Sequence, residues 1–344
     1  CDWHQAACLS LKSIQSVNIN TKSENNKLRV KEIPTISSSI HSPWAVKATT
    51  VSNMKIDKFD FDELEGFKTA QSLAYDMVRQ VGNELQTGIT EREACKRISA
   101  LLAEHGVTDM FHEPFAWFSS RTAFKDIKKD SDFQATDRSL KKGMAVILDV
   151  APIFDGYACD IAYSFSFGNN PDVEAMQKVL IECRDFILKS VRARKSMRLI
   201  YRELDGLIAS RGFVNVHRLY PERVLAHRVA RFEGSRSQRF LQRYRVMGYG
   251  LPVYVWLLGK AALAKIIPSI QSPLWNDGAE SDHAPLPGVW AVEPHIATPN
   301  YSAGAKWEEI LVVTDEEAFW LDDDVPHCQL ARKKGWWPVD GGIG

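Results

Sequence analysis

Apolar side chains recur at helical spacing in four segments of the chain, which form two consecutive pairs. The predicted helices cover about residues 67–85, 90–105, 172–191 and 197–210. Thr90 and Glu93 stand three residues apart at the start of the second segment, a spacing typical of a capping box. Gly88 and Gly212 follow the first and the last segments, and we expect them to end those helices.

Strand-like patterns follow each helix pair, so the chain reads as helix, helix, strands, and then the same order again. The predicted strands include residues 213–216, 223–229, 289–293 and 310–314, in addition to a hairpin that ends near residue 165. Helices that cover one face of a curved, mainly antiparallel sheet give an α+β fold. The repeated order predicts two similar halves around that sheet.

Three segments are expected along the chain: an N-terminal arm or leader at residues 1–56, a domain at 57–328 and a C-terminal tail at 329–344. The arm is rich in Ser, Asn and Lys and poor in acids, as leaders and flexible arms often are. An aromatic-rich insertion at about 235–288 contains the apolar stretch 251–270. This stretch is compatible with a core helix, with a lid over a pocket, or with a surface for lipid or a partner.

Composition narrows the class of protein. The chain has 344 residues, of which 45% are hydrophobic and 25% charged, with 43 basic and 43 acidic side chains. This balance is typical of a globular protein and gives no basic face for nucleic acid. No run of about 18 uncharged apolar residues occurs, so no transmembrane helix is expected. The six cysteines include no CxxC pair, which favours reduced thiols and a cytoplasmic location.

The candidate chemistry begins at the hairpin LDVAPIFDGYACDIAYSF, residues 148–165. Asp155-Gly156 predicts a two-residue turn that places Phe154 opposite Tyr157. In this register Asp149 and Asp160 are diagonal neighbours on one face, with Cβ atoms about 7 Å apart. Two bare carboxylates this close repel each other, and a bound cation removes the repulsion. A turn aspartate plus an aspartate at an exposed strand edge is the alternative interpretation.

Three later residues favour the cation. His227 lies at the end of the apolar pattern VLAHRV, where a histidine is also compatible with a buried structural role. Glu293 lies in a Trp-Ala-Val strand, where an unpaired carboxylate is costly. Glu308 precedes the strand ILVVT beside Glu309, so one of the two is expected to point inward and the other outward. Four carboxylates and one imidazole suit two divalent ions of manganese, iron, cobalt or zinc.

The order Asp149, Asp160, His227, Glu293, Glu308 resembles the pita-bread metallopeptidase family, which includes methionine aminopeptidase, aminopeptidase P, prolidase and creatinase. The local motifs are the hairpin with its D-G turn, AHRV, AVEP and EEILVVTD. The resemblance covers about residues 60–325 and implies the pita-bread fold.

The resemblance also implies a dinuclear metal-dependent hydrolase in which a metal-bridged water attacks a peptide or amide carbonyl. It implies that Asp149 binds one ion through both oxygens and that Asp160 and Glu308 bridge both ions. His227 and Glu293 would complete one ion, and Glu293 would also take a proton from the attacking water. A peptide or other small molecule would be the substrate, and a homodimer the assembly.

Two histidines that contact substrate in the family are missing from their usual places. Arg228 follows His227 where the family has a glycine. Gly234 is the seventh residue after His227, where the family has a second histidine, and Ser131 stands where the other histidine belongs. The remaining candidates are His295, as a catalytic residue, and then His112, His283 and His217. We consider His112 and His283 as candidate substrate-binding residues.

These departures leave three functions open. The first is a metal-dependent exopeptidase that releases an N-terminal residue. The second keeps the fold and the metal site for other chemistry, such as C–N hydrolysis of a non-peptide or an iron-dependent oxidation. The third is a non-catalytic descendant that binds a peptide or protein partner.

Overall fold

The computed structural model describes residues 61–232, 241, 244–246, 248–267 and 269–337. All of them belong to one compact unit, Lys47–Gly344. The predicted arm at residues 1–56 and the end of the predicted tail lie outside the described residues.

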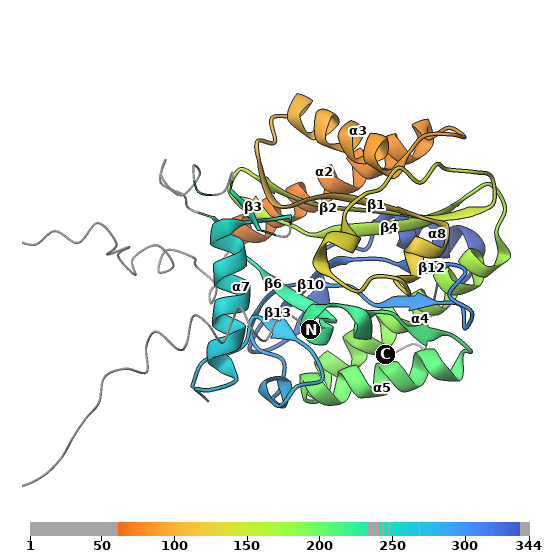
Figure 1. Ribbon diagram of the computed structural model, residues 1–344. Helices are drawn as coiled ribbons and strands as arrows, with labels where there is room; N and C mark the ends of the chain where they lie inside the picture. Colours follow the sequence, from red (N-terminus) through yellow and green to blue (C-terminus); the bar gives the residue numbers. More distant parts are fainter. Residues whose placement is uncertain (1–60, 233–240, 242–243, 247, 268, 338–344) are drawn as a thin grey trace, which may run out of the picture. The chain divides into compact units, whose positions relative to one another are not determined.

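The first half packs two helices against a six-stranded sheet. Its elements are α2 (Phe61–Glu84), α3 (Glu91–Glu104), β1 (Asp109–Phe118), β2 (Met144–Phe154), β3 (Tyr157–Ala158) and β4 (Ile161–Phe167), with short 3-10 turns at Ser119–Ala123 and Asp130–Phe133. The later segments β7 (Arg245–Val246) and β8 (Tyr249–Gly250) extend the sheet in the order β3-β2-β1-β8-β7, and β4 pairs with β2. Figure 1 shows α2 and α3 together on one side of this sheet, where they bury its apolar face.

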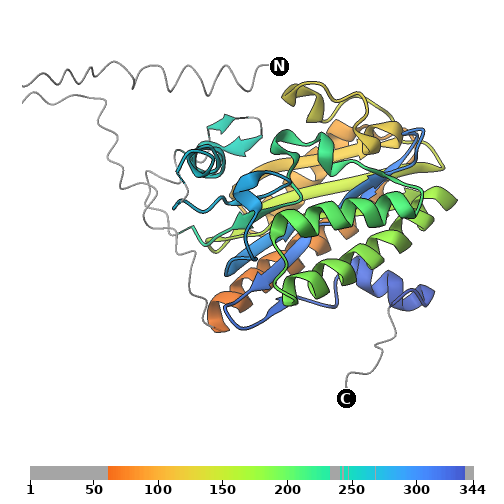
Figure 2. The same ribbon diagram turned by 90° about the horizontal axis from the view of Figure 1, so that it is seen from below.

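The second half repeats the order of two helices followed by strands. Its elements are α4 (Pro171–Arg192), α5 (Met197–Ser210), β5 (Val214–Asn215), β6 (Ala226–Val229), β9 (Leu274–Trp275), β10 (Gly288–Val292), β11 (His295–Ala297), β12 (Gly304–Lys306), β13 (Glu309–Val313), β14 (Ala318–Trp320) and α8 (Pro326–Lys334). The strands form a five-stranded sheet, β14-β13-β10-β6-β9, and a three-stranded sheet, β12-β11-β5. Figure 2 shows α4 and α5 crossing these strands on the side opposite α2 and α3.

The local predictions are confirmed. All four helices form within a few residues of their predicted bounds, except that α2 begins earlier, and Thr90 and Glu93 make the reciprocal bonds of a capping box. The hairpin has the predicted register, with Phe154 opposite Tyr157. Asp155 and Gly156 both have positive φ, 48° and 86°, as a type I′ turn requires.

The two halves join where β4 meets β12 and β13. Ala162 forms an isolated bridge with Glu308. The Ser164 hydroxyl accepts a hydrogen bond from the Lys306 backbone N–H at 2.8 Å and donates one to the Lys306 carbonyl at 2.6 Å. This seam fixes the strand that carries Lys306 and Glu308 against the hairpin that carries the two aspartates.

The described part of the insertion contributes β7, β8, β9 and the helix α7 (Leu251–Ala264). One side of α7 is core, with Val253 and Trp256 buried. The other side is exposed, since Val255 and Leu263 are 52% and 46% accessible. The core-helix interpretation is therefore correct for only one side of this helix.

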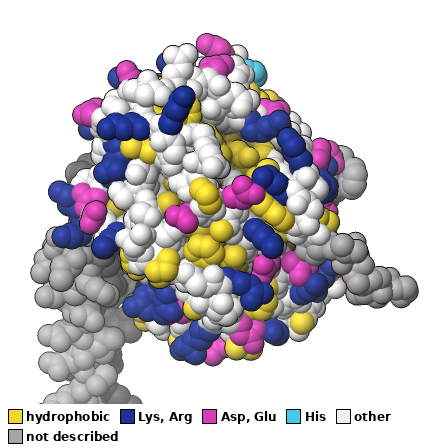
Figure 3. Space-filling model, turned by 90° about the vertical axis from the view of Figure 1, so that its right-hand side faces the viewer, with side chains coloured by type: hydrophobic (Ala, Val, Ile, Leu, Met, Phe, Trp, Pro, Cys, Tyr) yellow, Lys and Arg dark blue, Asp and Glu magenta, His cyan; other side chains and the backbone are white. Residues whose placement is uncertain are grey.

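The ends and the surface add three findings. The domain boundary predicted at residue 328 falls inside α8, where Cys328 and Ala331 are buried, so the packed unit continues past it. Among the described residues, no helix is both long and apolar enough to cross a membrane. Basic and acidic side chains alternate over the face seen in Figure 3, as the zero net charge of the chain suggests.

Candidate metal centre

The five predicted metal ligands come together at the seam between the halves. Asp149 lies in β2, Asp160 directly before β4, His227 in β6, Glu293 directly after β10 and Glu308 directly before β13. All five are buried, and Glu293 is the most accessible carboxylate at 8%. Residues from five strands or strand ends therefore converge on one small volume.

A lysine that the sequence analysis did not select lies among the carboxylates. Lys306 Nζ is 2.7 Å from Asp149 Oδ2, 2.8 Å from Glu293 Oε2 and 3.0 Å from Glu308 Oε2. Burial would lower the pKa of this amine, but the three carboxylates raise it well above its usual value. Lys306 and Glu308 are two residues apart, and on a strand such residues share a face, which was the available signal.

His227 faces two of the acids through one ring nitrogen. Its Nε2 is 3.2 Å from Asp160 Oδ2 and 3.7 Å from Glu308 Oε1. Its Nδ1 is 3.2 Å from the backbone carbonyl of Arg228, which can only accept, so the proton is placed on Nδ1. Phe111 stacks on the ring with centroids 5.3 Å apart and an interplanar angle of 11°.

His112 occupies a matching position on the other side of Asp160. Its Nε2 is 3.0 Å from Asp160 Oδ1 and 3.3 Å from Asp149 Oδ1. Its Nδ1 is 2.7 Å from the backbone carbonyl of Glu113. The structure thus brings His112, considered above only as a substrate contact, into direct contact with two predicted metal ligands.

Burial and neighbouring carboxylates raise the pKa values of these acids, whereas the two histidines lower them. Burial and Glu308 raise the pKa of Glu293 to about 8. Burial and Asp160 also raise the pKa of Glu308. Burial would raise the pKa of Asp160 too, but His112 and His227 together lower it below its ordinary value. Glu293 and Glu308 therefore resist ionisation at this site, whereas Asp160 ionises readily.

The other candidate histidines lie elsewhere. His295 Nε2 donates to the Thr122 carbonyl at 2.6 Å, and its Nδ1 accepts from the Tyr220 hydroxyl at 2.9 Å. His217 is paired with Asp205, and His283 Nδ1 lies 2.9 Å from the carbonyl of Ala284. The assignments of His295 and His283 to catalysis and substrate binding stay predictions, but neither contacts the five clustered ligands through these bonds.

Ser131 and Gly234 occupy the positions of the two missing histidines. Ser131 is exposed in a 3-10 turn, whereas the five clustered ligands are buried. Gly234 lies outside the described residues.

The donors present fit divalent cations. His112, Asp149 and Asp160 form one group of three donors with ligand atoms within 4.8 Å of one another, and Asp160, His227 and Glu308 form a second. Asp149 Oδ1 is buried and, among the described residues, accepts no hydrogen bond. Burial would lower the pKa of both imidazoles, but the neighbouring carboxylates raise it, to about 10 for His227. The buried acids therefore need cationic neighbours, a need that a bound divalent ion would meet.

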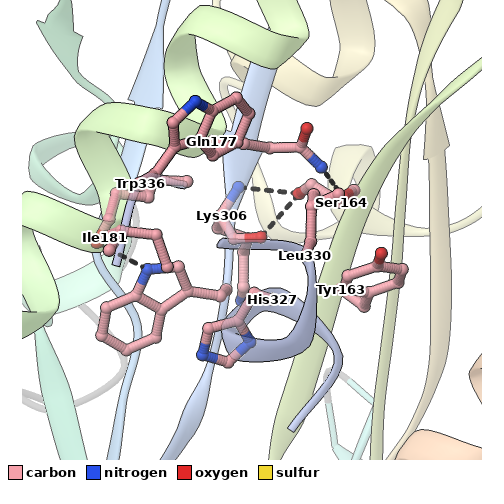
Figure 4. Close-up of a pocket in the computed structure, with 10 residues that line it drawn as sticks. Tyr163, Ser164, Gln177, Ile181, Lys306, His327, Leu330 and Trp336 are labelled. Atoms are coloured by element: carbon pink, nitrogen blue, oxygen red, sulfur yellow. Dashed lines mark hydrogen bonds between the residues drawn. The ribbon is translucent and has the colours of Figure 1, made fainter. Parts of the chain in front are cut away.

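The pocket in Figure 4 is separate from these acids. It is lined by Tyr163, Ser164, Gln177, Leu180, Ile181, Lys306, Trp307, His327, Leu330 and Trp336. None of the four carboxylates lines it, and Lys306 reaches both places because its ammonium joins the cluster while its backbone bonds to Ser164. Figure 4 shows these backbone bonds, which fix the position of the Lys306 main chain.

Comparison with known proteins agrees with this geometry. The family model "Metallopeptidase family M24" matches residues 65–315. An uncharacterized peptidase of Staphylococcus aureus (strain bovine RF122 / ET3-1) is 22% identical over 153 residues, covering 44% of this chain and 42% of that protein. An uncharacterized peptidase of Staphylococcus saprophyticus is 29% identical over 141 residues, covering 41% and 36%.

Solved structures show the same fold. The X-Pro aminopeptidase of Thermotoga maritima aligns with a TM-score of 0.55 and 17% identity, covering 76% of this chain and 61% of that one. The prolidase of Pyrococcus horikoshii OT3 aligns with a TM-score of 0.55 and 16% identity, covering 79% and 63%. These likenesses confirm the predicted pita-bread fold. The chain spans less than half the length of the two Staphylococcus peptidases that it matches.

Proposed function

This chain belongs to metallopeptidase family M24, and we propose that it is a hydrolase that uses two divalent metal ions to cleave a peptide or related amide bond. The observation that carries the proposal is the convergence of three buried carboxylates on two imidazole nitrogens, with the fourth, Glu293, joined to them through Lys306. Asp149, Asp160, His227, Glu293 and Glu308 would hold the ions. Bound ions of this kind polarise a carbonyl and lower the pKa of a water molecule.

Glu293 is the residue suited to move the proton. It is the most accessible of the four carboxylates, and its pKa is raised to about 8 by burial and by Glu308. A carboxylate at this position can take a proton from the attacking water, and the factors that raise its pKa favour holding that proton until it is delivered to the departing amine. Lys306, 2.8 Å from Glu293 Oε2, would hold this carboxylate in place beside the other acids.

The substrate class follows from the relatives in the fold comparison. Two of them are named as an X-Pro aminopeptidase and a prolidase. We therefore propose an exopeptidase that acts on short peptides, including peptides with proline in the second position.

A peptide panel tests this proposal. The purified chain is given Xaa-Pro dipeptides, Xaa-Pro-Yaa tripeptides and matched peptides without proline, in the presence of Mn²⁺, Fe²⁺, Co²⁺ or Zn²⁺. Release of the N-terminal residue is expected to require a metal and to fall by about 100-fold or more in Glu293→Gln. His105→Ala, which changes an exposed histidine at the end of α3, is the control and should keep full activity. A metal-loaded enzyme that cleaves none of these peptides contradicts the exopeptidase.

A second candidate is C–N hydrolysis of a non-peptide amide at the same centre. The exposed position of Ser131 favours it, because the family places a substrate-contacting imidazole there and the chain offers none. Loss of such a donor typically costs about 100- to 1000-fold in rate on the original substrate. Turnover of small apolar amides that exceeds turnover of every peptide would select this candidate.

A further inference from the structure

We propose that His112 is itself a metal ligand, so that each of the two ions is bound by one imidazole. The proposal rests on the metal-dependent function proposed above. It adds a sixth protein ligand to the five predicted from the sequence, and it gives His112 a role other than contact with substrate.

The backbone of β1 is shaped to point His112 at the acids. The pairing of β1 with β2 shifts register twice, once between Met110 and His112 and once between His112 and Phe115. Such β-bulges redirect side chains and are enriched beside functional sites. Here they let the consecutive residues Phe111 and His112 both reach the cluster, one stacking on His227 and the other contacting Asp160.

The hydrogen bond at Nδ1 fixes which nitrogen of His112 is available. A backbone carbonyl only accepts, so the 2.7 Å contact with the Glu113 carbonyl places a proton on Nδ1. In the neutral ring, the Nε2 lone pair then points at the carboxylates of Asp149 and Asp160. Three electron-pair donors that face one another in a buried site are stabilised by a shared cation. His227 has the same arrangement, with Nδ1 at the Arg228 carbonyl.

The distances between donors match coordination of one ion. Ligand atoms about 2.0–2.2 Å from a metal and about 90–110° apart are roughly 2.8–3.6 Å from each other. His112 Nε2 is 3.0 Å from Asp160 Oδ1 and 3.3 Å from Asp149 Oδ1. His227 Nε2, a predicted ligand, is 3.2 Å from Asp160 Oδ2 and 3.7 Å from Glu308 Oε1. His112 therefore lies at least as close to its carboxylates as His227 does.

Lys306 explains why an extra ligand is needed. The family resemblance implies that Asp149 binds one ion through both oxygens. In this chain Asp149 Oδ2 is 2.7 Å from Lys306 Nζ, which leaves only Oδ1 for an ion. The nitrogen of His112, 3.3 Å from that oxygen, replaces the donor that the lysine takes.

Cobalt substitution tests the assignment by a readout other than activity. The full chain is loaded with Co²⁺ alone, the bound metal is measured, and the proton NMR spectrum is recorded in H₂O and D₂O. An imidazole that binds Co²⁺ through Nε2 keeps its Nδ1–H, which gives a strongly shifted signal that disappears in D₂O. Two such signals are expected in the unmodified protein, and one in His112→Gln and in His227→Gln. His283→Gln should keep both.

Metal affinity supplies the second measurement. His112→Gln should weaken binding of one Co²⁺ at least about 10-fold while the other ion is retained, because a direct ligand contributes no less than an outer-shell partner. A protein with two bound Co²⁺ and only one shifted signal, unchanged in His112→Gln, would overturn the role of His112 and leave the proposed function standing. A protein that binds no Co²⁺ would overturn both. The signal count in the unmodified protein decides the question even if a variant fails to fold.

Discussion

Glu308 and Glu309 are adjacent, equally buried and opposite in environment. Glu308 faces the metal-ligand cluster, whereas Glu309 faces the other side of β13, toward α4 and α8. There Arg184 binds both oxygens of Glu309, at 2.6 and 3.0 Å, and His327 Nε2 lies 2.9 Å from Oε1. Glu309 is thus fully paired, while Glu308 shares the ammonium of Lys306 with two other acids and the imidazole of His227 with Asp160.

The direction of the pKa shift separates the two sides. Burial would raise the pKa of both, but Arg184 and His327 lower that of Glu309, whereas Asp160 adds to burial and raises that of Glu308. The Glu309 side also holds Cys328, and Glu309, His327 and Cys328 have ligand atoms close enough together to bind a metal. The guanidinium of Arg184 already neutralises that site. Clustering of several acids, rather than burial alone, therefore distinguishes the candidate metal centre.

The largest effect is expected from Asp160→Asn. This change keeps the shape of the side chain but removes the charge that both imidazoles face, at 3.0 and 3.2 Å. Metal affinity should fall by more than the roughly 10- to 100-fold typical of an outer-shell change, and activity should fall with it. Metal analysis after dialysis measures the loss. Glu309→Gln is the matched control, and equal metal loss in both variants would remove the distinction between the two sides.

Lys306→Met should make stability depend more strongly on metal than it does in the unmodified protein. Removing one partner of a buried ion pair costs roughly 3–5 kcal/mol, and Lys306 pairs with three carboxylates. Each ion present at 100 times its Kd should restore about 2.7 kcal/mol. Urea unfolding with and without Mn²⁺ measures both the loss of stability and its recovery by metal.

Lys334→Met is the control for that experiment, because its pair with Glu174 is exposed and worth about 0–1 kcal/mol. A Lys306→Met protein whose stability is the same with and without metal would contradict the account of the cluster.

Arg184→Met should lower the stability of the protein without affecting its metal binding. It leaves Glu309 buried and uncompensated, so the free energy of unfolding should fall by roughly 3–5 kcal/mol. Metal content should not change, and added metal should not rescue the loss. Arg211→Met, which breaks an exposed pair with Glu182, should change stability by no more than about 1 kcal/mol. Rescue of Arg184→Met by metal would show that the two sides are coupled.

The smallest effect is in the pH dependence of stability. The pKa of Glu309 is lower in the folded protein than its ordinary value of 4.5, so its pairing stabilises the fold fully above that value. The contribution is lost as the pH falls from there through the lower folded pKa, because the unfolded chain binds the proton first. Unfolding free energies from pH 7 to pH 3 should therefore fall more steeply in the unmodified protein than in Glu309→Gln. Replacement of the exposed Glu316 by Gln should leave the slope unchanged.

Local rules predicted much of this molecule. The hairpin register followed from Asp155-Gly156, because a two-residue turn with positive φ leaves one way to pair the strands. The α3 start followed from Thr90 and Glu93. The gathering of the five candidate ligands followed from strand alternation together with the family resemblance.

What the sequence did not predict depends on irregular backbone and long-range packing. The two bulges around His112 break the alternation from which its direction would be read. Lys306 was not among the predicted site residues, because its two-residue separation from Glu308 is a weak local signal for charge pairing across three strands. The outward-facing member of the Glu308–Glu309 pair was expected at the surface, but α4 and α8 cover it.

The central claim is that the Glu308 side of β13 binds metal and the Glu309 side does not. Metal content after equilibration of the full chain with Mn²⁺, Co²⁺ or Zn²⁺ and removal of free ions tests it most directly. We predict two ions per chain for at least one of these metals, with the same content in Glu309→Gln and far less in Asp160→Asn. Less than half an ion per chain with every metal would contradict the claim.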